Sequence, residues 1–383
     1  MLSGPNYHHF HLLRFNELGR VFWAHSLGMI GSSLISLFIP IYLYNLGFPL
    51  PEILLFYLLG NLYAIFLQYP MSRVIARFGA NRAMAVSTFF HIAYFVLLLT
   101  LPSGKWELGL VILPWAIARC LYWAAFHINF SKSRSKENAG RQLGLINAIV
   151  TLAHGVTPAL GGIAATEFGI SWVYGVAIGL FVISVVPLFF GMEVARKRLL
   201  KMRTVKWRKI RPDILSNFFN GMFTQSETMV WPLFVFFIVS SYAGVGLLSS
   251  VVTLAAIVVS IYVGRREATK GERHYLKEGA GVNTLTSAFR LLAENSGQIF
   301  GINLIGGIGH SLFATPFLSR YYEHADEEPR QEYVAVMETV NALGSLLFYV
   351  LLFSLSLYFT TSLVLFVGLA MAVPASLGMR LMR

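Results

Sequence analysis

The chain has 383 residues, of which 56% are hydrophobic and only 13% are charged, and its formal net charge is +12. A water-soluble domain usually carries about 25% charged residues, so this composition excludes an ordinary soluble protein of the same length. The single cysteine, Cys120, excludes an intramolecular disulfide.

Apolar runs follow one another along the whole chain, and about 20 helical residues are needed to cross a bilayer. They predict an all-α polytopic membrane protein with twelve transmembrane helices. The ninth run is the weakest because it contains Lys277, Glu278 and Arg290. The expected spans are residues 20–45, 51–72, 83–101, 107–130, 142–166, 171–192, 213–240, 245–264, 276–293, 298–320, 332–355 and 359–380.

The positive charges lie on one side of these spans. With the N-terminus in the cytoplasm, nearly all of the 30 lysines and arginines fall in cytoplasmic segments, whereas Lys105 lies in an outer loop and Arg119 and Arg290 lie within spans. We therefore expect a multi-pass integral membrane protein with both termini in the cytoplasm, in a prokaryotic inner (plasma) membrane. The lipid bilayer accounts for the basic residues, so we expect no nucleic-acid partner.

A basic linker near the middle of the chain divides the spans into two sets of six. Pro40 and Pro232 are separated by about half the length of the chain, and so are Gly79 and Gly271, which indicates an internal repeat. The predicted organisation is an N-terminal six-helix half over residues 1–192, a cytoplasmic linker over 193–212 and a C-terminal six-helix half over 213–383. Such paired repeats are typical of one large class of membrane transporters.

The basic turn "MSRVIARFGANR" follows the second span, and a related turn, "GRREATKGER", follows the eighth. Both resemble the loop between helices two and three of the major facilitator superfamily, whose motif runs Gly-x-x-x-Asp-Arg-x-Gly-Arg-Lys. Alanine stands at the acid position of the motif in both halves. The resemblance implies the fold of that family and a cytoplasmic gate, to which we add Glu338 on the eleventh span. The gate positions are Ser72, Ala76, Arg77 and Gly79 in the first half and Gly264, Ala268 and Gly271 in the second.

The fifth span resembles a second motif, Gly-x8-Gly-x3-Gly-Pro-x2-Gly-Gly, found in family members that export drugs against protons. Small residues allow helices to approach closely, and general helix packing is therefore the alternative interpretation. The motif positions here are Gly144, Ala153, Thr157, Pro158, Gly161 and Gly162, and His154 lies among them.

Ionisable side chains inside spans are costly to bury and are therefore functional candidates. The resemblance implies that helices one, four, seven and ten line a central cavity, which brings Arg119, Glu227 and His310 to it. Glu227 is expected to bind and release protons, with Arg119 or a cationic solute competing for its carboxylate. Packing and structural hydrogen bonds are the alternative for each residue. With the aromatic residues that share their helical faces, the predicted substrate and coupling residues are Arg119, Glu227, His310, Trp115, Tyr122, Trp123, Phe126 and Trp231.

No ATP-binding, zinc-ligand or nucleophile motif occurs in the sequence, so we expect no enzyme, no cofactor and no metal site. The resemblance implies a secondary active transporter with alternating access, energised by a proton gradient. The favoured hypothesis is a monomeric, proton-coupled antiporter that performs efflux of small amphipathic organic solutes. The alternatives are a proton-coupled nutrient importer, a ferroportin-like metal carrier and a non-transporting membrane sensor of the same fold.

Overall fold

The structure is a computed structural model that describes residues 17–104, 106–133, 155–189, 200–270 and 272–383, with the backbone alone over 260–270. Within these residues every regular element is a helix and none is a strand. Residues 155–167 form a further helix. The elements are α1 (Glu17–Ile35), η1 (Ser36–Phe38), α2 (Ile39–Asn45), α3 (Leu50–Phe78), α4 (Ala80–Thr100), α5 (Leu108–Ser133), α7 (Ile170–Phe189), η2 (Met202–Thr204), α8 (Trp207–Gln225), η3 (Ser226–Val230), α9 (Trp231–Val239), α10 (Tyr242–Lys270), α11 (Glu272–Arg290), α12 (Ser296–Glu327), α13 (Arg330–Ser356), α14 (Thr361–Gly378) and η4 (Met379–Leu381).

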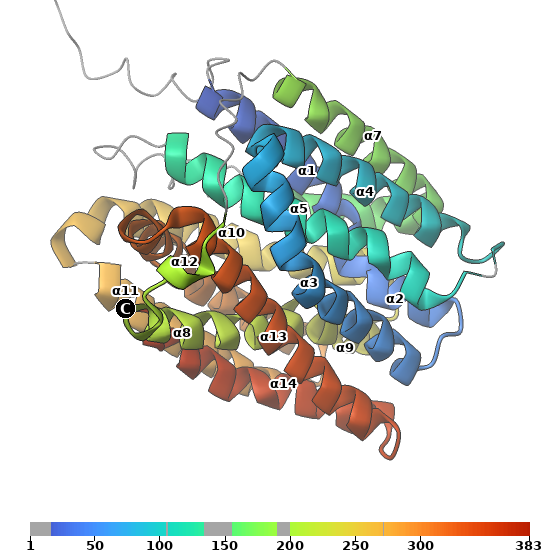
Figure 1. Ribbon diagram of the computed structural model, residues 1–383. Helices are drawn as coiled ribbons and strands as arrows, with labels where there is room; N and C mark the ends of the chain where they lie inside the picture. Colours follow the sequence, from blue (N-terminus) through green and yellow to red (C-terminus); the bar gives the residue numbers. More distant parts are fainter. Residues whose placement is uncertain (1–16, 105, 134–154, 190–199, 271) are drawn as a thin grey trace, which may run out of the picture.

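The helices lie side by side in one bundle, with α1 to α7 along one side and α8 to α14 along the other (Figure 1). On the first side α4 packs against α5 and α7, and on the second α11 packs against α12 and α14. Helix α13 also packs against α3, so it joins the two sides. Helix α8 begins at Trp207, inside the segment that we predicted as linker. The division into two repeated halves stays a prediction.

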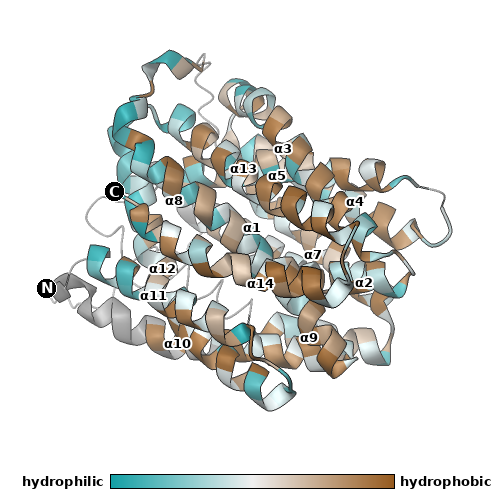
Figure 2. Ribbon diagram, turned by 90° about the horizontal axis from the view of Figure 1, so that it is seen from below, coloured by the Kyte–Doolittle hydropathy of each residue, from teal (hydrophilic) through white to brown (hydrophobic). Residues whose placement is uncertain are grey.

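Nine helical segments of the described residues are long and apolar enough to cross a membrane. Hydrophobic residues dominate the middle of the bundle, and hydrophilic residues gather at the end that carries the C-terminus (Figure 2). Helix α11 is not one of the nine, and it corresponds to the weak ninth run of the sequence. The prediction of an all-α polytopic membrane protein is confirmed.

The first and seventh spans are each interrupted near the middle. A 3-10 turn, η1, separates α1 from α2, and a π-helical turn, η3, separates α8 from α9. Pro40 and Pro232 lie in the first turns of α2 and α9, where proline is tolerated because the first helical N–H groups have no helical partner. These two short helices pack against each other, with the rings of Tyr44 and Phe237 4.9 Å apart.

Helices from before and after the linker also contact each other at both ends of the bundle. At one end Asn45 Nδ2 donates to the hydroxyl of Tyr242 at 2.9 Å, between α2 and α10. At the other end His127 Nδ1 lies 2.8 Å from the hydroxyl of Tyr322, between α5 and α12. A transporter of the alternating-access type would have to break one of these two sets of contacts at a time.

Candidate functional site

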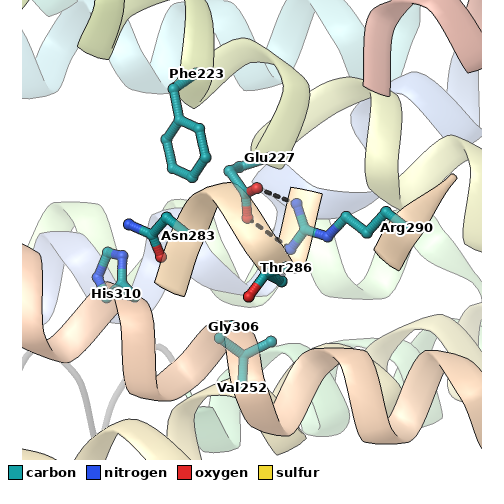
Figure 3. Close-up of a pocket in the computed structure, with 8 residues that line it drawn as sticks. All are labelled: Phe223, Glu227, Val252, Asn283, Thr286, Arg290, Gly306 and His310. Atoms are coloured by element: carbon teal, nitrogen blue, oxygen red, sulfur yellow. Dashed lines mark hydrogen bonds and ion pairs between the residues drawn. The ribbon is translucent and has the colours of Figure 1, made fainter. Parts of the chain in front are cut away.

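An ion pair joins Glu227 to Arg290. Glu227 lies on the π-helical turn η3, and Arg290 lies at the end of α11. Arg290 Nη2 donates to Glu227 Oε2 at 2.8 Å, and Nη1 donates to Oε1 (Figure 3). The arginine side chain is 2% exposed, whereas that of the glutamate is 29% exposed. Two parallel charge-assisted bonds make this a strong and geometrically specific pair, with the glutamate as its more accessible member.

The indole ring of Trp231 lies against the guanidinium of Arg290. The guanidinium carbon of Arg290 lies 4.7 Å from the centre of the indole ring, within the range of a cation–π interaction. The indole nitrogen donates to Asn303 Oδ1 at 3.0 Å, and Asn303 Nδ2 donates to the carbonyl of Leu248 at 2.7 Å. Trp231, one of the predicted site residues, is thereby fixed in orientation and positions the guanidinium.

A cavity with about 40 Å³ of room for water-sized groups adjoins this pair. A single water needs about 10–15 Å³ of such space, so the cavity can hold a small polar group but not a whole organic solute. Two predicted residues, Glu227 and His310, line it together (Figure 3). The lining residues come from α8, η3, α10, α11 and α12, and they are Phe223, Glu227, Val252, Asn283, Thr286, Arg290, Gly306 and His310.

Arg119, the other predicted cation, has amide partners. Its Nη1 donates to Asn61 Oδ1 at 2.8 Å, and its Nη2 donates to Asn341 Oδ1 at 2.9 Å. The ring of Trp115 lies 5.5 Å from its guanidinium carbon. In the structure Arg290, and not Arg119, binds the Glu227 carboxylate, so competition by Arg119 stays a prediction. Arg119 instead joins α3 and α5 to α13, across the two sides of the bundle.

Replacing Arg119 with lysine is expected to lower thermal stability. Lysine keeps the charge but cannot present two N–H groups in a planar fork, so one amide contact is lost, at a cost of about 1.5–3 kcal/mol. Thermal unfolding of the purified protein in detergent measures the effect. Arg203→Lys on η2, where the side chain is exposed, is the matched control. Equal unfolding temperatures for Arg119→Lys and the control would contradict this role.

The aromatic residues on the helical face of Arg119 do not all surround it. The hydroxyl of Tyr122 is hydrogen-bonded to His25 Nδ1 at 2.7 Å. The ring of Phe126 stacks on the ring of His25, with 3.9 Å between the ring centres. Trp123 stacks on His127 at 5.8 Å. These residues share one face of α5, as helical spacing predicted, but His25 on α1 covers part of that face.

The basic turn between α3 and α4 depends on its glycine. Gly79 has a φ of 96°, a conformation that L side chains rarely adopt, and its N–H donates to the carbonyl of Ile75 at 2.8 Å. Ser72 donates to the carbonyl of Gln68 at 2.8 Å, Ala76 is 5% exposed, and Arg77 is exposed. An acid at position 76 would therefore be buried.

The matching turn of the second half is described only in part. Gly264 and Ala268 lie on α10, where the structure describes the backbone alone, and Gly271 lies outside the described residues. Glu338 on α13 lies within 3.6 Å of His127 Nε2 on α5, so it joins the two sides of the bundle. The gate role of these residues stays a prediction.

The described part of the fifth-span motif packs against two other helices. A Cβ atom at Gly161 would lie 2.5 Å from the carbonyl oxygen of Leu34 on α1, and one at Gly162 would lie 2.4 Å from that of Tyr242 on α10. Thr157 and Pro158 belong to the same helix, residues 155–167. Gly144, Ala153 and His154 lie outside the described residues. Close backbone contact explains why glycine is needed at these two positions.

Gly162→Ala is expected to destabilise the protein. The added methyl group would meet backbone atoms that cannot move away singly, and such overpacking costs about 1–3 kcal/mol. Gly179→Ala on α7 is the control, because nothing lies within 4 Å of its Cβ position. That substitution should be neutral or slightly stabilising, since alanine favours a helix by up to about 1 kcal/mol over glycine. Equal unfolding temperatures for the two variants would contradict the close packing.

Arg290, Asn283, Asn61 and Asn303 belong to these networks and were not among the predicted site residues, whereas Asn341 was expected beside Glu338 at the cytoplasmic gate. The sequence signal that could have identified Arg290 as a site residue was its charge inside a predicted span. That charge was interpreted only as a reason why the ninth apolar run is weak. Among the residues that the structure describes, histidine, cysteine, aspartate and glutamate form no group of three that could hold a metal ion.

The long apolar helices define a multi-pass integral membrane protein, and an ion pair with a buried arginine lies among its helices. The sequence matches the Major Facilitator Superfamily over residues 21–349, and the chain belongs to that family of transporters. No curated protein matches the chain in a sequence comparison.

One similar solved structure is the human organic anion transporter MFSD10 (TETRAN). It has a TM-score of 0.67 and 12% sequence identity, and the match covers 94% of this chain and 98% of that one. At this identity the likeness concerns the fold alone.

Proposed function

We propose that this chain is a proton-coupled secondary transporter of small organic solutes, in which Glu227 carries the proton. The observation that supports it is the ion pair between the partly exposed Glu227, on an interrupted helix, and the buried Arg290, beside a polar cavity. A carboxylate can be neutralised by a proton, whereas an arginine keeps its charge in proteins. Protonation of Glu227 would therefore release Arg290 and change what the cavity can bind. The π-helical turn supports this role, since such turns are frequent at functional sites.

The fifth-span motif supports export as the direction of transport, that is, efflux of amphipathic solutes by antiport with protons. In this proposal the chain works as a monomer in a prokaryotic inner membrane, with both termini in the cytoplasm, and a proton gradient supplies the energy. Alternating access would open the contacts at one end of the bundle while those at the other end hold.

The ion pair favours a second candidate, uptake by proton symport. A solute anion that takes the place of Glu227 on Arg290 would leave that carboxylate free to accept a proton, so anion and proton would bind together. MFSD10, the solved protein of similar fold, is named as an organic anion transporter. An anionic solute for this chain agrees with that name, although the name describes only the other protein.

Proteoliposomes that contain the purified chain test both candidates. A solute identified by a thermal-shift screen is followed across the membrane under proton gradients imposed in opposite directions. Accumulation on the side from which protons leave indicates antiport, and accumulation on the side that protons enter indicates symport. A solute flux that is the same under both proton gradients would contradict proton coupling. If no solute that binds is transported, the result would favour the non-transporting alternative.

A further inference from the structure

The cavity beside the ion pair has hydrogen-bond donors that the described residues do not satisfy. Asn283 is 3% exposed, and its Nδ2 has no partner in the described part of the chain. The same holds for Nε of Arg290, which is 2% exposed. Buried donors without partners are costly, so their presence at a cavity points to a ligand that accepts hydrogen bonds.

The charge balance of the pair points the same way. Arg290 keeps its charge and is buried, so removal of Glu227, its carboxylate partner among the described residues, would leave an uncompensated buried cation. Glu227 is the partner that can become neutral or move, because it is partly exposed. Whenever Glu227 is protonated, another anion on Arg290 stabilises the site.

The shape of the site selects the kind of anion. The guanidinium carbon lies 4.7 Å from the centre of the Trp231 ring, and the guanidinium presents a planar pair of N–H groups, which matches a carboxylate in two parallel bonds. Gly306 lies beside the pair: a Cβ there would lie 3.1 Å from Thr286 Cγ2 and 3.7 Å from Arg290 Nη2, so a larger residue would narrow the cavity. Phe223 and Val252 line the same cavity with apolar surface. The cavity has the size of a head group, so the rest of a solute would extend beyond it.

We propose that Arg290 and Asn283 form a carboxylate-binding site for an organic anion, which takes the place of Glu227 on the guanidinium while Glu227 becomes protonated. This inference rests on the second candidate function, since it assigns the solute's charged group and the residue that binds it. No covalent step is involved: one proton moves to the Glu227 carboxylate, and one pair of hydrogen bonds is exchanged for another.

Binding to the purified full-length protein in detergent tests the site without any flux measurement. The probes are acetate, octanoate and benzoate, each compared with its uncharged amide, and the readouts are the unfolding temperature and tryptophan fluorescence, to which Trp231 contributes. We expect a carboxylate to stabilise the wild type more than its amide does, and more strongly at mildly acidic than at mildly basic pH. If no carboxylate acts more strongly than its amide, the proposal is overturned.

Three variants locate the effect. Glu227→Gln imitates the protonated acid, so carboxylate affinity should rise about tenfold and depend less on pH, with His310 as the other titratable residue of the cavity. Asn283→Asp adds a negative charge at nearly unchanged size and should lower affinity by about the same factor. Glu227→Gln/Arg290→Gln removes both charges together, which keeps the fold more safely than a single arginine substitution, and should bind carboxylates no better than amides.

Unchanged affinity in Glu227→Gln, or selective carboxylate binding that survives in the double variant, would place the anion elsewhere. Because no gradient is used, this result is separate from the transport test. Carboxylate binding without proton-coupled flux would overturn the proposed function alone, and proton-coupled flux of a solute without carboxylate binding at Arg290 would overturn this inference alone.

Discussion

Glu227→Gln is expected to abolish proton-driven accumulation of the transported solute in proteoliposomes while the protein stays folded. Glutamine keeps the size of the side chain and one oxygen that can accept from Arg290, but it cannot bind and release a proton. A gradient of one pH unit supplies about 1.4 kcal/mol per proton, which corresponds to about tenfold accumulation when one proton moves with one solute. The variant should only equalise the two concentrations.

The experiment compares accumulation under an imposed proton gradient with exchange of labelled solute at equal concentrations on both sides. Exchange should survive in Glu227→Gln, because it needs no net proton movement. Glu294→Gln is the matched control, since that carboxylate is exposed in the loop after α11. Proton-driven accumulation that persists unchanged in Glu227→Gln would show that Glu227 has a structural role only.

The substitution Glu227→Leu is expected to destabilise the protein more than Arg290→Leu. Glu227→Leu leaves a buried arginine that cannot lose its charge, at a cost of about 3–5 kcal/mol. Arg290→Leu leaves a partly exposed glutamate that can take up a proton, so its cost should be lower. The double variant should recover most of the loss, because neither charge remains unpaired.

Thermal unfolding of the wild type, the two single variants and the double variant forms a double-mutant cycle. The expected coupling energy lies near the upper end of the usual 0.5–3 kcal/mol for residues in contact, or roughly 3 kcal/mol. If the two single effects simply add in the double variant, the pair does not stabilise the fold as the geometry indicates. A larger effect at position 290 than at 227 would contradict the assignment of Arg290 as the group that cannot become neutral.

The residues of the site show what sequence reasoning could and could not reach. Glu227, His310 and Trp231 were predicted because a charged or aromatic side chain at mid-span is visible in one helix alone, and the structure brings all three to the Glu227–Arg290 site. Arg119 and its aromatic face were predicted in the same way, but their neighbours were not. Helical periodicity tells which side chains share a face, and it does not tell which other helix covers that face.

The sequence by itself determined the membrane-spanning helices, the weak ninth run, the tight turn at Gly79 and the membership of a transporter family. Each of these depends on local features: the length of an apolar run, the backbone freedom of a glycine or a short motif. Only the tertiary structure decided that Arg290, 63 residues away in the chain, holds Glu227, and that Asn341, 222 residues away, holds Arg119. The physical reason is that an ion pair or hydrogen bond requires contact within about 3 Å, and such contact depends on how separate helices pack.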